Sequence, residues 1–187
     1  MSTKKIATYG VLAALSIVLL FFKFPIPMFM ALEYDFADVP IIICTTFFGV
    51  MPGLLLTAIV CLAQGFLSAS SGIIGVAMHF VATGSFVLVY GLIFRMKKNL
   101  LFAIIGDIMG IITWVTVMVG MNIWLTPIFL GIPRASVYPL LLPIIVPFNA
   151  IKASVNSILA ITLASSLDRV LKLRLIKKPK AKEKNCT

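Results

Sequence analysis

The chain has 187 residues, of which 61% are hydrophobic and only 12% are charged. So little polar surface excludes a soluble globule and indicates an integral membrane protein. The net charge of +10 does not indicate nucleic-acid binding, because the basic residues lie at the ends of apolar segments and not in a patch interleaved with aromatic residues. Three cysteines, two of them inside apolar segments, also exclude a disulfide framework.

The first apolar run, residues 6–22, predicts a retained first membrane helix, since no small-residue cleavage site follows it. Gly10 and Ala14 lie one turn apart on one face of this helix, and such a pair lets another helix approach closely. That helix belongs either to a partner protein or to the same bundle. Pro25 and Pro27 then stop the first helix.

Residues 24–38 predict a loop that folds against the protein, because the acids Glu33, Asp35 and Asp38 lie there among apolar side chains. Asp38, with a proline two residues later, predicts the start of the second helix with its carboxylate as N-cap. That helix ends near Gly49, so it is about 18 Å long against a hydrocarbon core of about 30 Å. It is short, or the loop before it dips into the membrane.

Three further spans are predicted at residues 52–67, 75–94 and 100–125. The fourth span contains His79, the only histidine, which cannot form a metal site alone. The fifth contains Asp107 between two glycines that form a GxxxG pair. Residues 126–138 contain two prolines and a glycine and predict a loop.

The sixth span runs to about residue 167 and carries Asn149, Lys152 and Asn156 at i, i+3 and i+7, so the three side chains share one helix face. A lysine at the centre of a span costs about 2.5 to 3.5 kcal/mol even on the lenient insertion scale. The favoured interpretation is therefore a functional site. In the alternative, Lys152 snorkels to the headgroups and the asparagines bond neighbouring helices.

Six spans place both termini on one side of the membrane. Thirteen of the sixteen basic residues also fall on that side, including eight in the tail at about 169–187. The positive-inside rule makes this side cytoplasmic, so the first loop and the start of the sixth span lie outside.

Three runs carry a resemblance to a known family: KFPIP at 23–27, LEYDFADVP at 32–40 and PFNAIK at 147–152. They resemble the RibU family, the riboflavin-specific S components, or substrate-binding subunits, of energy-coupling factor (ECF) transporters. The resemblance covers nearly the whole chain, residues 1–187. It implies an all-α fold of six transmembrane helices in one membrane domain, with a long first extracellular loop. It also implies uptake of the vitamin across the bacterial cell membrane.

The resemblance implies partners as well: a membrane-embedded T component and two cytosolic ATPase subunits, which would drive release of riboflavin inside. Riboflavin would be the transported ligand and not a cofactor. Gly10 and Ala14 would form the docking face for the T component. The chain would not be an enzyme, and the sequence agrees, since it has no GxxxxGK[ST] motif for ATP and no nucleophile with a base.

The flavin-binding residues that the resemblance implies are Asn122, Asn149 and Lys152, with Asn156 one turn deeper as a weaker candidate. An asparagine amide matches both the N–H and the carbonyl groups at the pyrimidine edge of the flavin ring, whereas lysine supplies donors only. The apolar loop residues Met28 and Leu32 would cover the flat ring. Each of these loop residues could equally pack the loop onto the bundle.

Two other functions remain open. One is an S component for another vitamin. The other is a proton-coupled secondary carrier that uses Asp107 as its proton carrier, although the sequence shows no inverted repeat of the kind many such carriers have. The ordinary interpretation of Asp107 is a helix-end acid paired with Lys97 or Lys98, or held in a helix interface.

Overall fold

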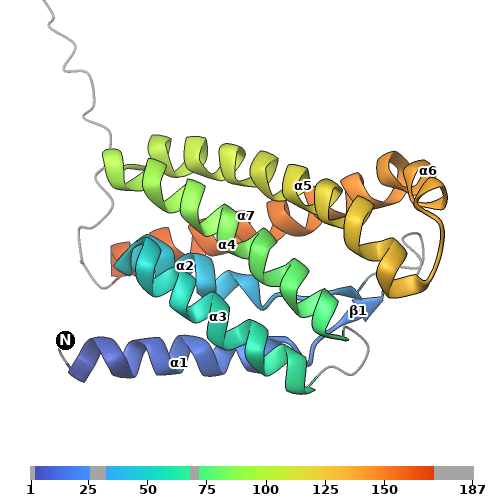
Figure 1. Ribbon diagram of the computed structural model, residues 1–187. Helices are drawn as coiled ribbons and strands as arrows, with labels where there is room; N and C mark the ends of the chain where they lie inside the picture. Colours follow the sequence, from blue (N-terminus) through green and yellow to red (C-terminus); the bar gives the residue numbers. More distant parts are fainter. Residues whose placement is uncertain (1–2, 26–32, 68–71, 171–187) are drawn as a thin grey trace, which may run out of the picture.

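The computed structural model describes residues 3–25, 33–67 and 72–170. Its helices lie side by side along one direction, as Figure 1 shows. They are α1 (Thr3–Leu19), α2 (Asp38–Phe48), α3 (Val50–Leu67), α4 (Gly72–Met96), α5 (Leu100–Leu130), the short α6 (Tyr138–Leu140) and α7 (Val146–Val170). Two other short helical turns flank α6: the 3-10 turn η2 (Arg134–Ser136) and the π-helical turn η3 (Leu141–Ile145). An all-α fold is therefore confirmed.

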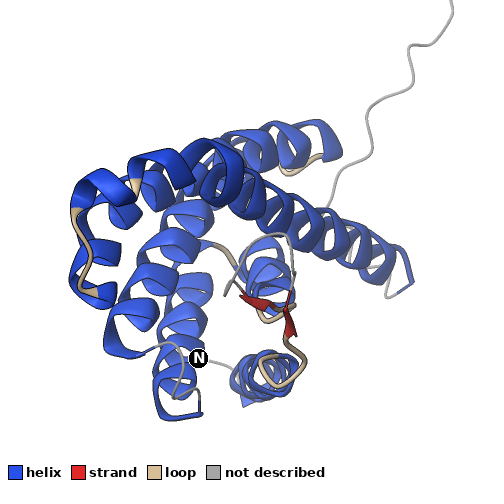
Figure 2. Cartoon of the chain, turned by 90° about the vertical axis from the view of Figure 1, so that its right-hand side faces the viewer, coloured by secondary structure: helices blue, strands red, loops and turns tan. Residues whose placement is uncertain are grey.

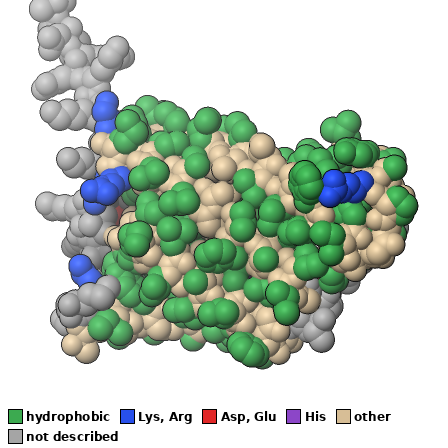
Figure 3. All heavy atoms as spheres, in the orientation of Figure 1, with side chains coloured by type: hydrophobic (Ala, Val, Ile, Leu, Met, Phe, Trp, Pro, Cys, Tyr) green, Lys and Arg blue, Asp and Glu red, His purple; other side chains and the backbone are tan. Residues whose placement is uncertain are grey.

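The two ends of the bundle differ. The start of α1, the connection between α4 and α5 and the end of α7 lie together at the left in Figure 1, and α6 and the small β-sheet lie at the right. The space-filling view shows most of the visible basic side chains at the left end, a smaller basic patch at the right end, and a surface rich in apolar side chains between the ends (Figure 3). An apolar girdle with charges at its ends is the surface that a bilayer requires. We call the end with the β-sheet the hairpin end.

Four helical segments of the described chain are long and apolar enough to cross a membrane: Val50–Leu67, Gly72–Met96, Leu100–Leu130 and Arg134–Arg169. Two more apolar helices, Lys5–Leu19 and Asp38–Phe48, are shorter. With 11 residues, α2 is about 16 Å long, roughly half of the hydrocarbon core. The described chain thus contains six apolar helical segments in the predicted order, and the second of them is short, as predicted.

The described parts of segment 24–38 include two short strands. Strands β1 (Phe24–Pro25) and β2 (Glu33–Tyr34) pair antiparallel, with Phe24 opposite Tyr34. Lys23 and Glu33 form an exposed ion pair of 2.6 Å beside this pairing. The residues that follow α1 therefore pair with those that precede α2, and Figure 2 shows this strand pair from the hairpin end.

The prediction of a loop at 126–138 is wrong for its first part, because α5 continues through Pro127 to Leu130. Proline removes only one backbone donor near the helix end, and Thr126 adds a local bond to the Asn122 side chain. The helix stops at Gly131, whose φ of 65° is the left-handed geometry that favours glycine. The glycine and not the proline sets the end of the helix.

The GxxxG pair in α5 packs against α4. A Cβ atom on Gly110 would lie 2.8 Å from the Phe86 ring, and one on Gly106 would lie 3.1 Å from the carbonyl oxygen of Tyr90. Such distances leave no room for a larger side chain. This pair is therefore an internal packing motif, and α4 and α5 share the most extensive helix contact in the described bundle.

Candidate functional site

A buried ion pair joins the end of the hairpin to α7. The Lys152 ammonium donates to a carboxylate oxygen of Asp35 at 2.8 Å, and both side chains are about nine-tenths buried, with exposed fractions of 10% and 7%. The other Asp35 oxygen accepts the backbone N–H of Ala37 at 3.1 Å, which fixes the turn before α2. Lys152 therefore does not snorkel, and the alternative interpretation of this residue is wrong.

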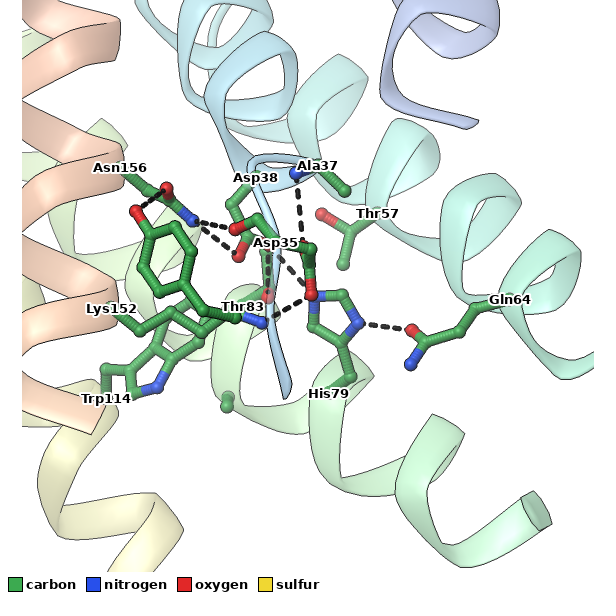
Figure 4. A network of polar contacts seen from close by, with 12 residues as sticks. Asp35, Ala37, Asp38, Thr57, Gln64, His79, Thr83, Trp114, Lys152 and Asn156 are labelled. Atoms are coloured by element: carbon green, nitrogen blue, oxygen red, sulfur yellow. Dashed lines mark hydrogen bonds and ion pairs between the residues drawn. The ribbon is translucent and has the colours of Figure 1, made fainter. Parts of the chain in front are cut away.

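Asp38 lies next to this pair and is completely buried. Its Oδ1 atom accepts from Thr83 at 2.9 Å and lies 3.0 Å from Nε2 of His79, and its Oδ2 atom accepts from Asn156 at 3.3 Å. The other His79 nitrogen contacts the Gln64 side chain. Figure 4 shows these side chains converging from α2, α3, α4 and α7.

The predicted role of Asp38 as an N-cap is wrong. Ala37 occupies the N-cap position of α2, and no side chain caps this helix end. The Asp38 carboxylate turns instead toward α4 and α7, because donors on those two helices offer a buried carboxylate three hydrogen bonds. A carboxylate at a helix start can either cap its own helix or accept bonds from other helices, and Asp38 does the second.

Asn156 connects the two acids to the hairpin. Its amide nitrogen donates to the backbone oxygen of Asp35 at 3.0 Å as well as to Asp38, and its amide oxygen accepts from the Tyr34 hydroxyl at 2.7 Å. Burial raises the pKa of Tyr34 to about 12, so its hydroxyl remains protonated and donates this bond at physiological pH. Tyr34 is thereby held against α7.

Asn149 lies one turn before Lys152 and has its own partners. Its amide oxygen accepts from the Trp114 indole at 3.1 Å, and its amide nitrogen donates to the Ile145 backbone oxygen at 2.8 Å. The second bond reaches into η3, where the π-helical turn leaves the backbone with irregular bonding. Trp114 therefore ties α5 to the same face of α7.

The hydrogen bonds of Asn122 do not involve the described residues of α7. Its side chain donates to the Met118 backbone oxygen and accepts from Thr126, both within α5. Among the described residues, no hydrogen bond joins Asn122 to Asn149 or Lys152. The structure thus links Lys152 and Asn156 through Asp35, and Asn149 lies buried on the same face of α7 with its own bonds to Trp114 and Ile145. Asn122 lies on α5, which packs against α7.

Aromatic side chains pack beside the cluster. Tyr34 and Phe36 meet edge to face with ring centres 5.0 Å apart, and Phe24 meets Phe36 at 6.0 Å. Tyr34 and Phe148 form a small buried cluster together with Phe36 and Ile144. An apolar wall beside a few fixed polar groups is the composition expected of a small-molecule site. Met28 and Leu32, predicted to cover a flat ring, lie outside the described residues.

The polar partners that sequence reasoning missed are Asp35, Asp38, His79, Gln64, Thr83, Tyr34 and Trp114. One signal was present: three acids in a segment otherwise rich in apolar residues must find donors when they are buried. The described part of the chain gathers no group of three metal-binding side chains.

The remaining predicted residues lie elsewhere. Gly10 and Ala14 are exposed on α1, and a Cβ atom added to Gly10 would have no neighbour within 4 Å. Asp107 is buried, and its Oδ1 atom has no hydrogen-bond partner in the described part of the chain. No ion pair joins Asp107 to Lys97 or Lys98 in the described part of the chain, and its burial agrees instead with the other ordinary interpretation, a position held in a helix interface.

Together, the fold and the site define a polytopic α-helical membrane protein with one buried polar cluster near its hairpin end. The family of substrate-specific components of ECF transporters matches residues 4–164. The chain belongs to this family.

Individual relatives are similar over nearly their whole length. The riboflavin transporter RibU of Staphylococcus aureus (strain TCH60) is 32% identical over 176 residues, which cover 90% of this chain and 93% of that protein. The riboflavin transporter RibU of Streptococcus thermophilus is 29% identical over 182 residues, covering 91% and 85%. A solved structure of the S component of a bacterial ECF transporter superposes with a TM-score of 0.81 at 31% identity, covering 92% of this chain and 99% of that one.

Proposed function

We propose that this chain is the riboflavin-binding S component of an ECF transporter. The observation that carries the proposal is the similarity to two riboflavin transporters along about nine-tenths of the chain. The buried cluster supports it, because Asn149 and Lys152 lie on one face of α7 next to an aromatic wall. Other vitamins remain the nearest alternative, since the family is defined by its transporter and not by one substrate.

In this proposal, Asn149 and Lys152 bind the polar edge of the isoalloxazine ring. That edge alternates carbonyl acceptors with an N–H donor, and an amide complements both while an ammonium complements the carbonyls. Lys152 carries three N–H donors, and among the described residues only Asp35 accepts from one of them, so two donors would remain for a ligand. Asn149 would exchange a bond with Trp114 or Ile145 for one with the ring.

Asn122 joins the proposed site from α5, and Asn156 is a secondary candidate. The Asn156 amide already makes three bonds within the protein, so it supports its neighbours better than it offers free groups to a ligand. The apolar faces of the ring would meet Phe36 and the segment that contains Met28 and Leu32. These assignments agree with the general composition of small-molecule sites, which are mostly apolar with a few polar anchors.

We further propose that the protein lies in the bacterial cell membrane with both termini in the cytoplasm, and that it works with a T component and two ATPase subunits. The excess of basic residues at the end opposite the hairpin supports this orientation. The exposed Gly10 and Ala14 on α1 would form the docking face for the T component, since small residues permit close helix contact. Riboflavin would then enter its site from outside.

The proposal is tested by purifying the protein in detergent and recording its visible spectrum. A co-purifying flavin gives a characteristic absorption band, and removal of the flavin should leave a protein that quenches riboflavin fluorescence with saturation at one ligand per chain. Biotin and thiamine serve as controls for other vitamins. Absence of any riboflavin binding by the folded, ligand-free protein would refute the proposal.

A further inference from the structure

Asp38 occupies a special position in the network of Figure 4. It is fully buried, and its two carboxylate oxygens accept hydrogen bonds from donors on both α4 and α7. Thr83 and His79 hold Oδ1 from α4, and Asn156 donates to Oδ2 from α7. The carboxylate at the start of α2 therefore links the helix that carries the proposed site to a helix that does not.

The Asn156 amide has only one possible orientation in this arrangement. Two oxygen atoms, the Asp38 Oδ2 and the Asp35 backbone oxygen, lie on the side of its nitrogen, at 3.3 and 3.0 Å. A flipped amide would place its own oxygen against both, and the protonated Tyr34 hydroxyl would face an NH2 group. Asp38 thus fixes the amide, and the amide fixes Tyr34.

The same amide also holds the backbone of Asp35, whose carboxylate holds Lys152. A continuous set of hydrogen bonds therefore runs from Thr83 and His79 through Asp38 and Asn156 to the two groups beside the proposed riboflavin site, Tyr34 and the Asp35–Lys152 pair. The donors at one end of this path are on α4, outside the site.

We infer that Asp38 is a positioning residue for the riboflavin site, and that Thr83 sets its position from α4. This inference rests on the proposed function. Asp38 acts through Asn156, which holds the hairpin end and Lys152 in the arrangement that the ligand meets. Residues that act on a binding site through such a contact path change binding by about 0.5–2 kcal/mol, which corresponds to about 2- to 30-fold in affinity.

The test compares two buried threonines on neighbouring helices whose hydroxyl groups have different partners. Thr83 and Thr57 both have an exposed fraction of 0%, but the Thr83 hydroxyl donates to Asp38 whereas the Thr57 hydroxyl donates only to the Gly53 backbone oxygen of its own helix. Thr→Val replaces the hydroxyl by a methyl group of nearly equal size. We expect Thr83→Val to weaken riboflavin binding about 2- to 30-fold, mainly through faster dissociation, and Thr57→Val to leave the affinity unchanged.

Two further variants show whether Thr83 acts on the position of the binding groups or only on the stability of the protein. Thr83→Ser retains the hydroxyl and should restore affinity to within about twofold of the parent. Tyr34→Phe removes the hydroxyl at the other end of the path, so the combined Thr83→Val and Tyr34→Phe variant should bind only slightly more weakly than Tyr34→Phe alone. If Thr83→Val does not fold, Thr83→Cys, with its weak donor, should give a smaller loss in the same direction.

The inference is overturned if folded Thr83→Val or Thr83→Cys binds riboflavin as tightly as the parent while its melting temperature falls, or if the two losses in the double variant simply add. Both outcomes leave the proposed function intact, because the parent still binds. Failure of the parent to bind riboflavin would instead reject the proposed function itself.

Discussion

The Nζ atom of Lys152 lies 2.8 Å from a carboxylate oxygen of Asp35, although 117 positions separate the two residues in the chain. This contact brings the hairpin onto α7 at the place where the ligand-binding residues are proposed. A buried lysine without its acid would be costly, since removal of one partner from a buried pair costs about 3–5 kcal/mol. The pair therefore makes the hairpin and α7 depend on each other.

The first prediction concerns Lys152 and Asn149. Replacement of Lys152 by Met, or of Asn149 by Ala, should weaken riboflavin binding by roughly tenfold to several hundredfold. A hydrogen bond from a charged group contributes about 1.5–3 kcal/mol, and loss of one partner strands the other in a dry site. Titration of riboflavin fluorescence quenching against each folded variant measures the effect.

Lys23 provides the matched control, because it is also a lysine that forms an ion pair with an acid of this hairpin, Glu33. Its pair with Glu33 is exposed, with exposed fractions of 21% and 39%, so it contributes about 0–1 kcal/mol to stability at most. Lys23→Met should bind riboflavin like the parent. Affinities within about threefold of the parent for both Lys152→Met and Asn149→Ala would remove this site from consideration.

The second prediction concerns the exposed small residues of α1. Replacement of both Gly10 and Ala14 by Leu should abolish uptake by the complete transporter while the isolated subunit still binds riboflavin, because larger side chains keep a partner helix at a distance. Uptake in cells and fluorescence titration of the purified subunit measure the two effects. Leu15→Trp, on another exposed side of α1, is the control and should keep uptake. Loss of binding together with uptake would favour packing within the protein.

The third prediction concerns Asp107. Asp107→Asn should keep riboflavin binding and most of the uptake, because ATP hydrolysis by the partner subunits supplies the energy in the proposed mechanism. The Oδ1 atom of Asp107 has no described partner, so an uncharged amide of the same shape fits at least as well in a buried position. Uptake that continues without the ATPases and collapses with the proton gradient would support a proton-coupled carrier.

The fourth prediction concerns topology. A cysteine at Glu33 should react with membrane-impermeant reagents applied to intact cells, whereas one at Met96, which is 72% exposed at the opposite end, should react only with permeant ones. Cys186 is replaced by Ser, while Cys44 and Cys61 are buried and can remain. The reverse labelling pattern would invert the proposed orientation.

The shared face of Asn149, Lys152 and Asn156 could be predicted from the sequence, because helical periodicity alone places residues at i, i+3 and i+7 together. The start of α2 at Asp38 and the break at Gly49 could be predicted as well, since proline and glycine act locally. The predicted end of α5 at about residue 125 is wrong, because a proline near a helix end removes only one hydrogen bond and the left-handed Gly131 ends the helix.

The partners of these residues could not be predicted. Asp38 and His79 are 41 positions apart, and Tyr34 and Asn156 are 122 apart, so no local pattern joins them. Asp38 fits a helix N-cap equally well by sequence, and only the packing of α2 against α4 and α7 selects the buried role. An acid in an apolar segment indicates that it has hydrogen-bonding partners if it is buried, but only the tertiary structure determines which residues they are.

The π-helical turn η3 before Asn149 has a consequence for how related sequences align. A π-helical turn closes its hydrogen bonds over five residues instead of four, so residues 141–145 contain one residue more than an α-helical turn needs. A relative that lacks one residue here could keep Asn149 and Lys152 on the same face, whereas a deletion between Asn149 and Lys152 would rotate the two side chains apart by about 100°. Single-residue gaps among functional relatives should therefore fall within 141–145.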